Sequence, residues 1–174
     1  MIRAFGVAVA VVLTNLSAGA AAAQSLSVDM DQFRGRWFEV LRSPNDIQRD
    51  CRRSQIDFTA QDRANRYGLV VRCTRPDDEV ELLRANARVT DPGVNTRFRF
   101  TLTGMLSFGG LAGQNYRVLD RAADYSWAIL ALPDGSDWWV WHRSQTPPPS
   151  IRAQLIARAR AAGLDTSRIV HTGR

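Results

Sequence analysis

Hydrophobic and polar residues alternate along short segments of the chain from residue 36 onward. In the segment 96–103, Phe98, Phe100 and Leu102 alternate with arginine and threonine residues. A period of two is typical of a strand with one buried face. Turn residues separate eight segments of strand length, which are 36–43, 54–61, 67–74, 81–89, 96–103, 115–121, 126–132 and 136–143. Eight regularly spaced strands without an intervening helix indicate an antiparallel meander.

One apolar face on each of eight strands favours an all-β fold, an eight-stranded up-and-down β-barrel with an apolar interior. Small residues on the inward face, such as Ala85 and Ala87, favour a cavity over a fully packed core. With Trp37 placed inward, strand alternation predicts the residues that line this cavity. They are Leu41, Ile56, Phe58, Leu69, Val71, Leu83, Ala85, Ala87, Phe98, Phe100, Tyr116, Val118, Trp139 and Trp141.

A C-terminal α-helix is expected to follow the last strand and to pack outside the barrel. Prolines 147–149 end the strand, and Ser150 is the expected N-cap. Apolar residues at helical spacing form one stripe, and Arg152 is expected to face solvent on the other side. Residues 167–172 are expected to form a short final strand.

Composition excludes several classes of chemistry. The 174 residues include 23 basic residues, all arginine, and 17 acidic residues, for a formal net charge of +6. Without lysine, Schiff-base and P-loop chemistry are excluded. The basic residues are scattered along the chain, so we expect a solvated basic surface and no nucleic-acid partner. Two histidines and two cysteines leave little material for a metal site, and we expect no metal and no cofactor.

Residues 1–23 have the pattern of a cleaved signal peptide: Arg3, then an apolar segment at 4–13, then small residues at 21–23. The alternative is a membrane anchor, but the apolar segment is about half the roughly 20 residues that a spanning helix needs. Cleavage would leave one domain, residues 24–174. No cysteine follows the small residues, so lipoprotein processing is not available. We therefore expect a periplasmic or secreted protein.

Cys51 and Cys73 form an even pair in an exported chain, which favours a disulfide. The predicted hairpin between them, paired about its centre, brings the two residues together at its open end. A reactive thiol pair is the alternative, but the C-x-x-C spacing typical of such pairs is missing.

Three local motifs resemble those of the lipocalin family, in the order and places expected for it. Gly35-Arg36-Trp37 resembles the G-x-W signature of the first strand, and residues 139–144 resemble the eighth-strand segment that contains a packing arginine. Asp124-Tyr125 resembles the T-D-Y turn, although Ala123 replaces the threonine. The resemblance covers residues 30–172 and implies the eight-stranded barrel with its C-terminal helix.

The tail of the chain is similar to the bacterial outer-membrane-type lipocalins, relatives of apolipoprotein D, although the lipidated cysteine of that group is missing. The similarity lies in Tyr116-Arg117-Val118, the hairpin at 134–143, the helix and residues 163–168. It implies binding, transport or storage of a small hydrophobic or amphipathic ligand, such as a fatty acid or lysophospholipid. It implies no enzymatic step.

Three residues near the ends of the barrel are expected to be structural. Trp37 supplies a large apolar plate that plugs the closed end, Arg143 can lay its guanidinium over the indole, and Gly35 belongs to the same motif. Glu39 has the inward parity of Trp37. Two interpretations of Glu39 stay open: a polar anchor for a ligand headgroup, or a partner of an internal arginine or water.

Two alternative functions stay open from the residues alone. One is a lipocalin-fold enzyme acting on a hydrophobic substrate, with a free cysteine, or Glu39 together with Asp120, as its reactive group. The other is a membrane-surface interaction module that uses Arg49, Arg52 and Arg53 against anionic lipids. The expected oligomeric state is a monomer or weak dimer.

Overall fold

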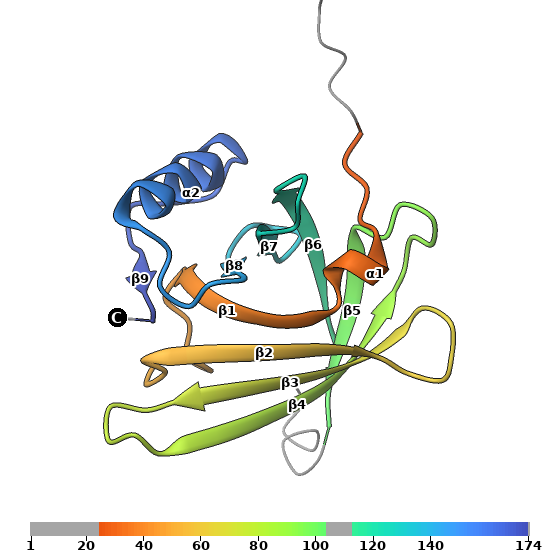
Figure 1. Ribbon diagram of the computed structural model, residues 1–174, viewed down its shortest axis with the longest axis horizontal. Helices are drawn as coiled ribbons and strands as arrows, with labels where there is room; N and C mark the ends of the chain where they lie inside the picture. Colours follow the sequence, from red (N-terminus) through yellow and green to blue (C-terminus); the bar gives the residue numbers. More distant parts are fainter. Residues whose placement is uncertain (1–24, 104–112, 174) are drawn as a thin grey trace, which may run out of the picture.

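A computed structural model describes residues 25–103 and 113–173 (Figure 1). The predicted signal peptide, residues 1–23, lies outside the described residues. The elements are, in chain order, α1 (Met30–Phe33), β1 (Gly35–Arg42), β2 (Arg53–Ala60), β3 (Arg66–Thr74), β4 (Val80–Val89), β5 (Arg97–Leu102), β6 (Gln114–Arg121), β7 (Trp127–Ala131), β8 (Trp138–His142), α2 (Pro149–Ala161) and β9 (Val170–His171).

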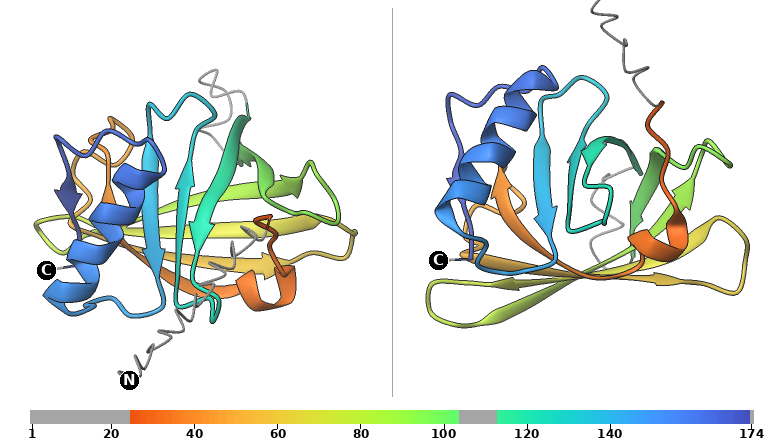
Figure 2. Two further views of the ribbon diagram at one scale, coloured as in Figure 1. Left: turned by 90° about the horizontal axis from the view of Figure 1, so that it is seen from above. Right: turned by 45° about the horizontal axis from the view of Figure 1, so that its top comes forward.

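The strands form a closed barrel. From β2 to β8 each strand pairs antiparallel with the next, β8 pairs with β1, and β1 also pairs with β2. The short strand β9 pairs with the end of β1 as an additional strand (Figure 2). The expected eight-stranded up-and-down barrel with a C-terminal helix is confirmed, and each barrel strand ends within two residues of its predicted segment.

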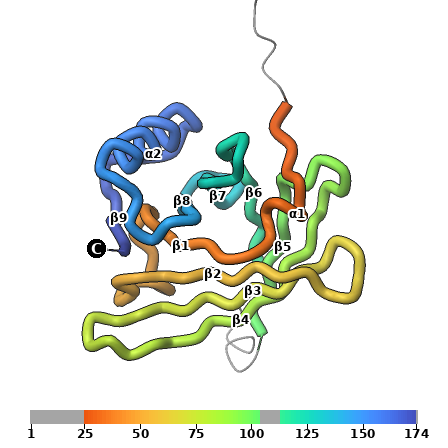
Figure 3. The backbone as a smooth tube through the Cα atoms, viewed as in Figure 1, coloured from red at the N-terminus to blue at the C-terminus, as the bar shows by residue number. Residues whose placement is uncertain are grey.

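One end of the barrel is filled by aromatic side chains. The short helix α1, which the sequence pattern did not predict, lies directly before β1 (Figure 3). Its Phe33 is fully buried, with its ring centre 5.5 Å from that of Phe58 and 5.8 Å from that of Phe98. This cluster closes the barrel at the α1 end and leaves the other end for a cavity.

Arg143 fastens this closed end. Its guanidinium carbon lies 3.5 Å from the centre of the Trp37 ring. Its Nη2 donates to the backbone oxygen of Gln32 at 2.6 Å, and its Nη1 donates to that of Arg36 at 2.7 Å. Gly35 has φ +101° and passes close to this arginine: a Cβ at Gly35 would lie 3.4 Å from Arg143 Nη1. Gly35, Trp37 and Arg143, the three residues expected to be structural, therefore pack together at the closed end.

Strand β1 contains an irregularity that changes which residues point inward. Its pairing with β8 shifts between Glu39 and Leu41. Before the shift Glu39 faces the interior; after it Arg42 does so, and Leu41 packs in a second hydrophobic cluster with Val140. The prediction that Leu41 lines the cavity is therefore wrong, because a bulge interrupts the strict alternation on which it depended.

Helix α2 packs outside the barrel through Leu155 and Ala159. Two predictions about this helix are wrong. The N-cap is Pro148 and not Ser150, because the fixed φ of Pro149 suits the first helical position. Arg152 does not face solvent: it is buried and donates to the backbone oxygen of Val40 at 2.8 Å, which ties the helix to β1. No helix within the described ranges is long and apolar enough to cross a membrane.

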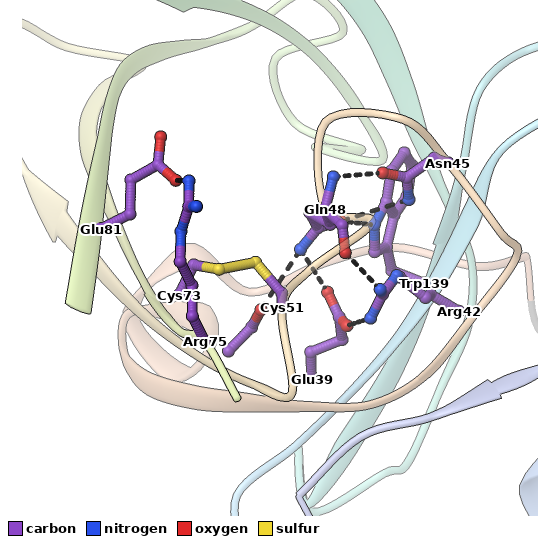
Figure 4. Close-up of a disulfide and its surroundings, with 10 residues drawn as sticks. Glu39, Arg42, Asn45, Gln48, Cys51, Cys73, Arg75, Glu81 and Trp139 are labelled. Carbon is purple, nitrogen blue, oxygen red and sulfur yellow. Dashed lines mark hydrogen bonds and ion pairs between the residues drawn. A yellow bond between two sulfur atoms is a disulfide. The ribbon is translucent and has the colours of Figure 1, made fainter. Parts of the chain in front are cut away.

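The predicted disulfide between Cys51 and Cys73 is confirmed, with a Cα–Cα distance of 5.2 Å. It joins the segment before β2 to the end of β3 (Figure 4). The bridge fixes one end of the segment 43–52, which connects β1 to β2 at the end of the barrel opposite α1.

Candidate functional site

A cavity of about 800 Å³ occupies the half of the barrel away from α1. It reaches the surface beside Asp46 and Arg49, which are exposed. Its size is in the range of pockets that take small organic ligands. Every barrel strand contributes to its wall, and the segment 44–49 forms part of its rim.

Nine of the fourteen residues expected to line the cavity lie on its wall. They are Ile56, Leu69, Val71, Leu83, Ala85, Phe100, Tyr116, Trp139 and Trp141. Leu102 and Leu130 continue the same apolar surface. The wall from β2 to β5 is therefore almost wholly apolar, which is the chemistry that favours a hydrophobic ligand.

Four other expected lining residues point inward but do not reach the cavity. They are Phe58, Ala87, Phe98 and Val118, which pack in the solid core at the closed end. Phe33 fills the space beside them, so this half of the barrel is occupied by the chain itself. These four predictions are wrong as cavity assignments, because alternation tells only the face of a strand and not the depth along the barrel axis.

The polar part of the cavity is built on an ion pair inside the barrel. Arg42 Nη1 donates to Glu39 Oε1 at 2.9 Å, and both side chains are 1% exposed. Gln48 Nε2 donates to the second carboxylate oxygen of Glu39 at 2.7 Å, and Arg42 Nη2 donates to the backbone oxygen of Gln48 (Figure 4). Glu39 thus has an internal arginine as its partner, one of the two interpretations that the sequence left open.

Gln48 connects this ion pair to the rim and to β8. Trp139 Nε1 donates to Gln48 Oε1 at 2.7 Å, and the Gln48 backbone N–H donates to Asn45 Oδ1 at 2.9 Å. Cys51, three residues further, is fixed by the disulfide. The connecting segment 43–52 is therefore held by side-chain hydrogen bonds at its centre, around Gln48, and by the disulfide of Cys51 near its end.

Burial dominates the electrostatics of the cavity. It raises the pKa of Glu39 above its ordinary value, while the Arg42 charge and the Gln48 amide act in the opposite direction. Burial, with a smaller effect of the Asp137 charge, raises the pKa of Tyr116 to about 12. The hydroxyl group of Tyr116 donates a hydrogen bond to Gln114 Oε1 at 2.9 Å.

One donor at the polar end is left over: Arg42 Nε is buried and has no hydrogen-bond partner within the described ranges. The sequence pattern missed Arg42 because of the β1 bulge, and it missed Asn45 and Gln48 because strand alternation does not extend into a connecting segment. The one available signal was Glu39 itself, since an inward carboxylate requires a polar partner.

Comparisons with known proteins agree with this geometry. A family model described as a lipocalin-like domain matches residues 28–174. The outer membrane lipoprotein Blc of Escherichia coli K12 is 22% identical over 142 residues, which is 82% of this chain and 77% of the relative.

Among solved structures, lobster apocrustacyanin A1 has a TM-score of 0.61 at 15% identity, over 82% of this chain and 77% of that chain. The siderocalin Ex-FABP, whose structural report describes dual ligand specificities, has a TM-score of 0.56 at 14% identity, over 81% and 93% of the two chains. These likenesses show the barrel fold.

Proposed function

The chain belongs to the lipocalin-like family, and from that premise we propose that its barrel binds, carries or stores a small hydrophobic or amphipathic molecule, such as a fatty acid or lysophospholipid. The single observation that carries the proposal is the cavity of about 800 Å³ with an apolar wall and one polar end. Transfer of apolar surface from water to such a wall is favourable by about 25 cal/mol per Å².

The distribution of polar groups supports an amphipathic ligand. Ile56, Leu69, Val71 and Phe100 form an apolar surface for a hydrocarbon tail. Arg42, Asn45 and Gln48 gather at the other side of the same cavity. The headgroup of an amphipathic ligand would lie at this polar side of the cavity.

The reactive groups named for the enzyme alternative are a free cysteine thiol and the pair of Glu39 and Asp120. Both cysteines are in the disulfide, so no free thiol is available for nucleophilic chemistry. Asp120 Oδ2 accepts a hydrogen bond of 2.9 Å from Arg158 Nη1 on α2, outside the barrel. Glu39 lies inside the barrel, on the wall of the cavity. The structure therefore does not bring Glu39 and Asp120 together as an acid–base pair.

The arginines named for the membrane-surface alternative have acidic partners. Arg49 pairs with Asp46, and Arg52 and Arg53 both pair with Asp78. Two carboxylates offset two of the three positive charges, so this group attracts an anionic surface less than three free arginines would. This observation favours the ligand-binding function over that alternative.

We further propose that the protein is exported to the periplasm or to the exterior of the cell. The confirmed disulfide is typical of oxidising compartments, and the E. coli relative is named an outer membrane lipoprotein.

Native mass spectrometry of the full chain expressed in its exported form, followed by solvent extraction, tests the function. We expect a protein species that carries extra mass, and a lipid in the extract that accounts for it. An empty protein that also fails to bind a fluorescent fatty acid in solution would overturn the proposal.

A further inference from the structure

Three arginines stand in a row across the outer face of the barrel. In the antiparallel pairing of β3, β4 and β5, Arg66 lies opposite Arg88, and Arg88 lies opposite Arg99. All three are exposed, while the neighbouring Ala87 is buried on the inner face. The expectation that basic residues are scattered is correct along the chain but wrong on the surface, because strand pairing gathers residues that are 33 positions apart at the extremes.

The arginine row has no acidic partner. None of the ion pairs among residues 25–103 and 113–173 includes Arg66, Arg88 or Arg99. On the adjacent part of the barrel the pattern differs, since Asp57 pairs with both Arg36 and Arg72. Like charges directly opposite each other on paired strands are destabilising. The row is therefore a charge arrangement that lowers stability unless an anion is present.

The row borders a small hollow of about 220 Å³, which also contains Asn86 and Thr101. Gln61 Nε2 donates to Asn86 Oδ1 at 2.8 Å, which leaves the amino group of Asn86 as the donor available to a ligand. Guanidinium, amide and hydroxyl donors therefore meet in one hollow.

A glycine keeps the edge of this hollow open. A Cβ at Gly113 would lie 2.7 Å from Thr101 Oγ1 and 3.1 Å from Arg99 Nε. Any larger residue at that position would press on two of the donors.

We propose that Arg66, Arg88 and Arg99, with Asn86 and Thr101, form a binding site for a phosphate group on the outside of the barrel. Planar guanidinium groups match phosphate oxygens in two-point hydrogen bonds, and several arginines around one phosphate is a common solution for this anion. The phosphate is supplied either by free inorganic phosphate or by the headgroup of an anionic phospholipid. The site is separate from the cavity and does not depend on what the cavity holds.

Arg88→Gln tests the site, because it removes the central charge of the row. Arg160→Gln is the matched control: it removes the same charge from an exposed position on α2. Thermal melting is measured in sodium phosphate and in sodium chloride of equal ionic strength. We expect phosphate to raise the Tm of wild type and of the control more than chloride does, and to have no such effect on Arg88→Gln.

A calorimetric titration with inorganic phosphate gives the affinity. We expect the affinity for phosphate to fall about tenfold or more in Arg88→Gln and to stay unchanged in the control. In chloride, Arg88→Gln should melt no lower than wild type, since it relieves repulsion. Equal phosphate effects in all three proteins, or a lower Tm of Arg88→Gln in chloride, would overturn the site.

Vesicles distinguish the two sources of phosphate. Sedimentation is compared for pure phosphatidylcholine and for phosphatidylcholine mixed with phosphatidylglycerol. Binding to the mixed vesicles that Arg88→Gln loses assigns the headgroup as the source, whereas a phosphate effect without vesicle binding assigns the free anion. Unchanged fatty-acid binding by Arg88→Gln shows that the barrel is folded and that this result is independent of the cavity.

Discussion

Arg42 and Glu39 form an ion pair of 2.9 Å inside the barrel, at the wall of the cavity, with both side chains 1% exposed. Glu39 and Arg42 are three positions apart, so in a regular strand they would point to opposite faces. A bulge in β1 turns both of them to the inner face. Two charges in such a place are stable only together, since each alone would be buried without compensation.

Removing one partner of this pair should therefore destabilise the protein strongly. We expect Glu39→Gln and Arg42→Met each to lower the free energy of unfolding by about 3–5 kcal/mol. The double variant Glu39→Met/Arg42→Met should lose less than the sum of the two single losses, because no lone charge remains. Urea denaturation measures the free energy of unfolding of the two single variants and of the double variant. Additive losses would contradict the coupling of the two charges.

The position of Arg143 over Trp37 predicts a second large effect. Arg143→Ala should lower the free energy of unfolding by at least about 3 kcal/mol, because it removes a cation–π contact and charged hydrogen bonds to several backbone oxygens. Arg143→Lys should recover part of this loss, since an ammonium keeps the charge but not the flat stacking geometry. Chemical denaturation measures the free energy of unfolding of these variants, with Arg160→Ala as the control. Equal stability of Arg143→Ala and the control would contradict the stabilising role of Arg143.

Sequence alternation was sufficient for the barrel because each strand must bury one face, and a period of two survives in nearly every segment. It was insufficient for the depth of a residue: Phe58 and Leu69 both point inward, but only Leu69 reaches the cavity. The missing information is the helix α1, whose Phe33 packs against Phe58 and Phe98 and helps to close that end of the barrel.

The polar end of the cavity and the arginine row were missed for a different reason. The polar end is made by residues within 39–48, whose facing depends on a bulge and on a connecting segment, whereas the arginine row joins residues far apart in the chain through strand register. Leu41 and Arg42 exchange roles through a one-residue bulge that no local pattern marks. Arg66 and Arg88 become neighbours only through the pairing of β3 with β4.

The disulfide should stabilise the barrel and hold the rim of the cavity. Its two cysteines are 22 residues apart, for which loop closure predicts a contribution of about 3 kcal/mol. We expect Cys51→Ala/Cys73→Ala to lose about this much and to show faster hydrogen exchange at the Gln48 amide, which lies in the tethered segment. Wild type should give no free thiols under denaturing conditions. An unchanged unfolding free energy in the double variant would contradict this account.

The pKa of Tyr116, raised to about 12 by burial, predicts a pH effect of definite sign. An unfolded tyrosine ionises near 10. Between about pH 10 and pH 12 the unfolded chain therefore loses a proton that the folded protein keeps, and stability falls as the pH rises. The difference in tyrosinate absorbance between wild type and Tyr116→Phe should show a transition near pH 12. A transition near pH 10 would show that Tyr116 is not buried in the cavity.

The most direct test of ligand binding in the cavity is a titration of three proteins with a fluorescent fatty acid. Ala85→Phe places a ring into the cavity, and Leu82→Phe places one on the outer face of the same strand, where Leu82 is 45% exposed. Excess bulk in a formed site costs about 1–3 kcal/mol, so Ala85→Phe should bind about tenfold or more weakly. Wild type and Leu82→Phe should saturate with the same Kd. Equal binding by Ala85→Phe, or no saturable binding by wild type, would contradict the assignment of the cavity as the ligand site.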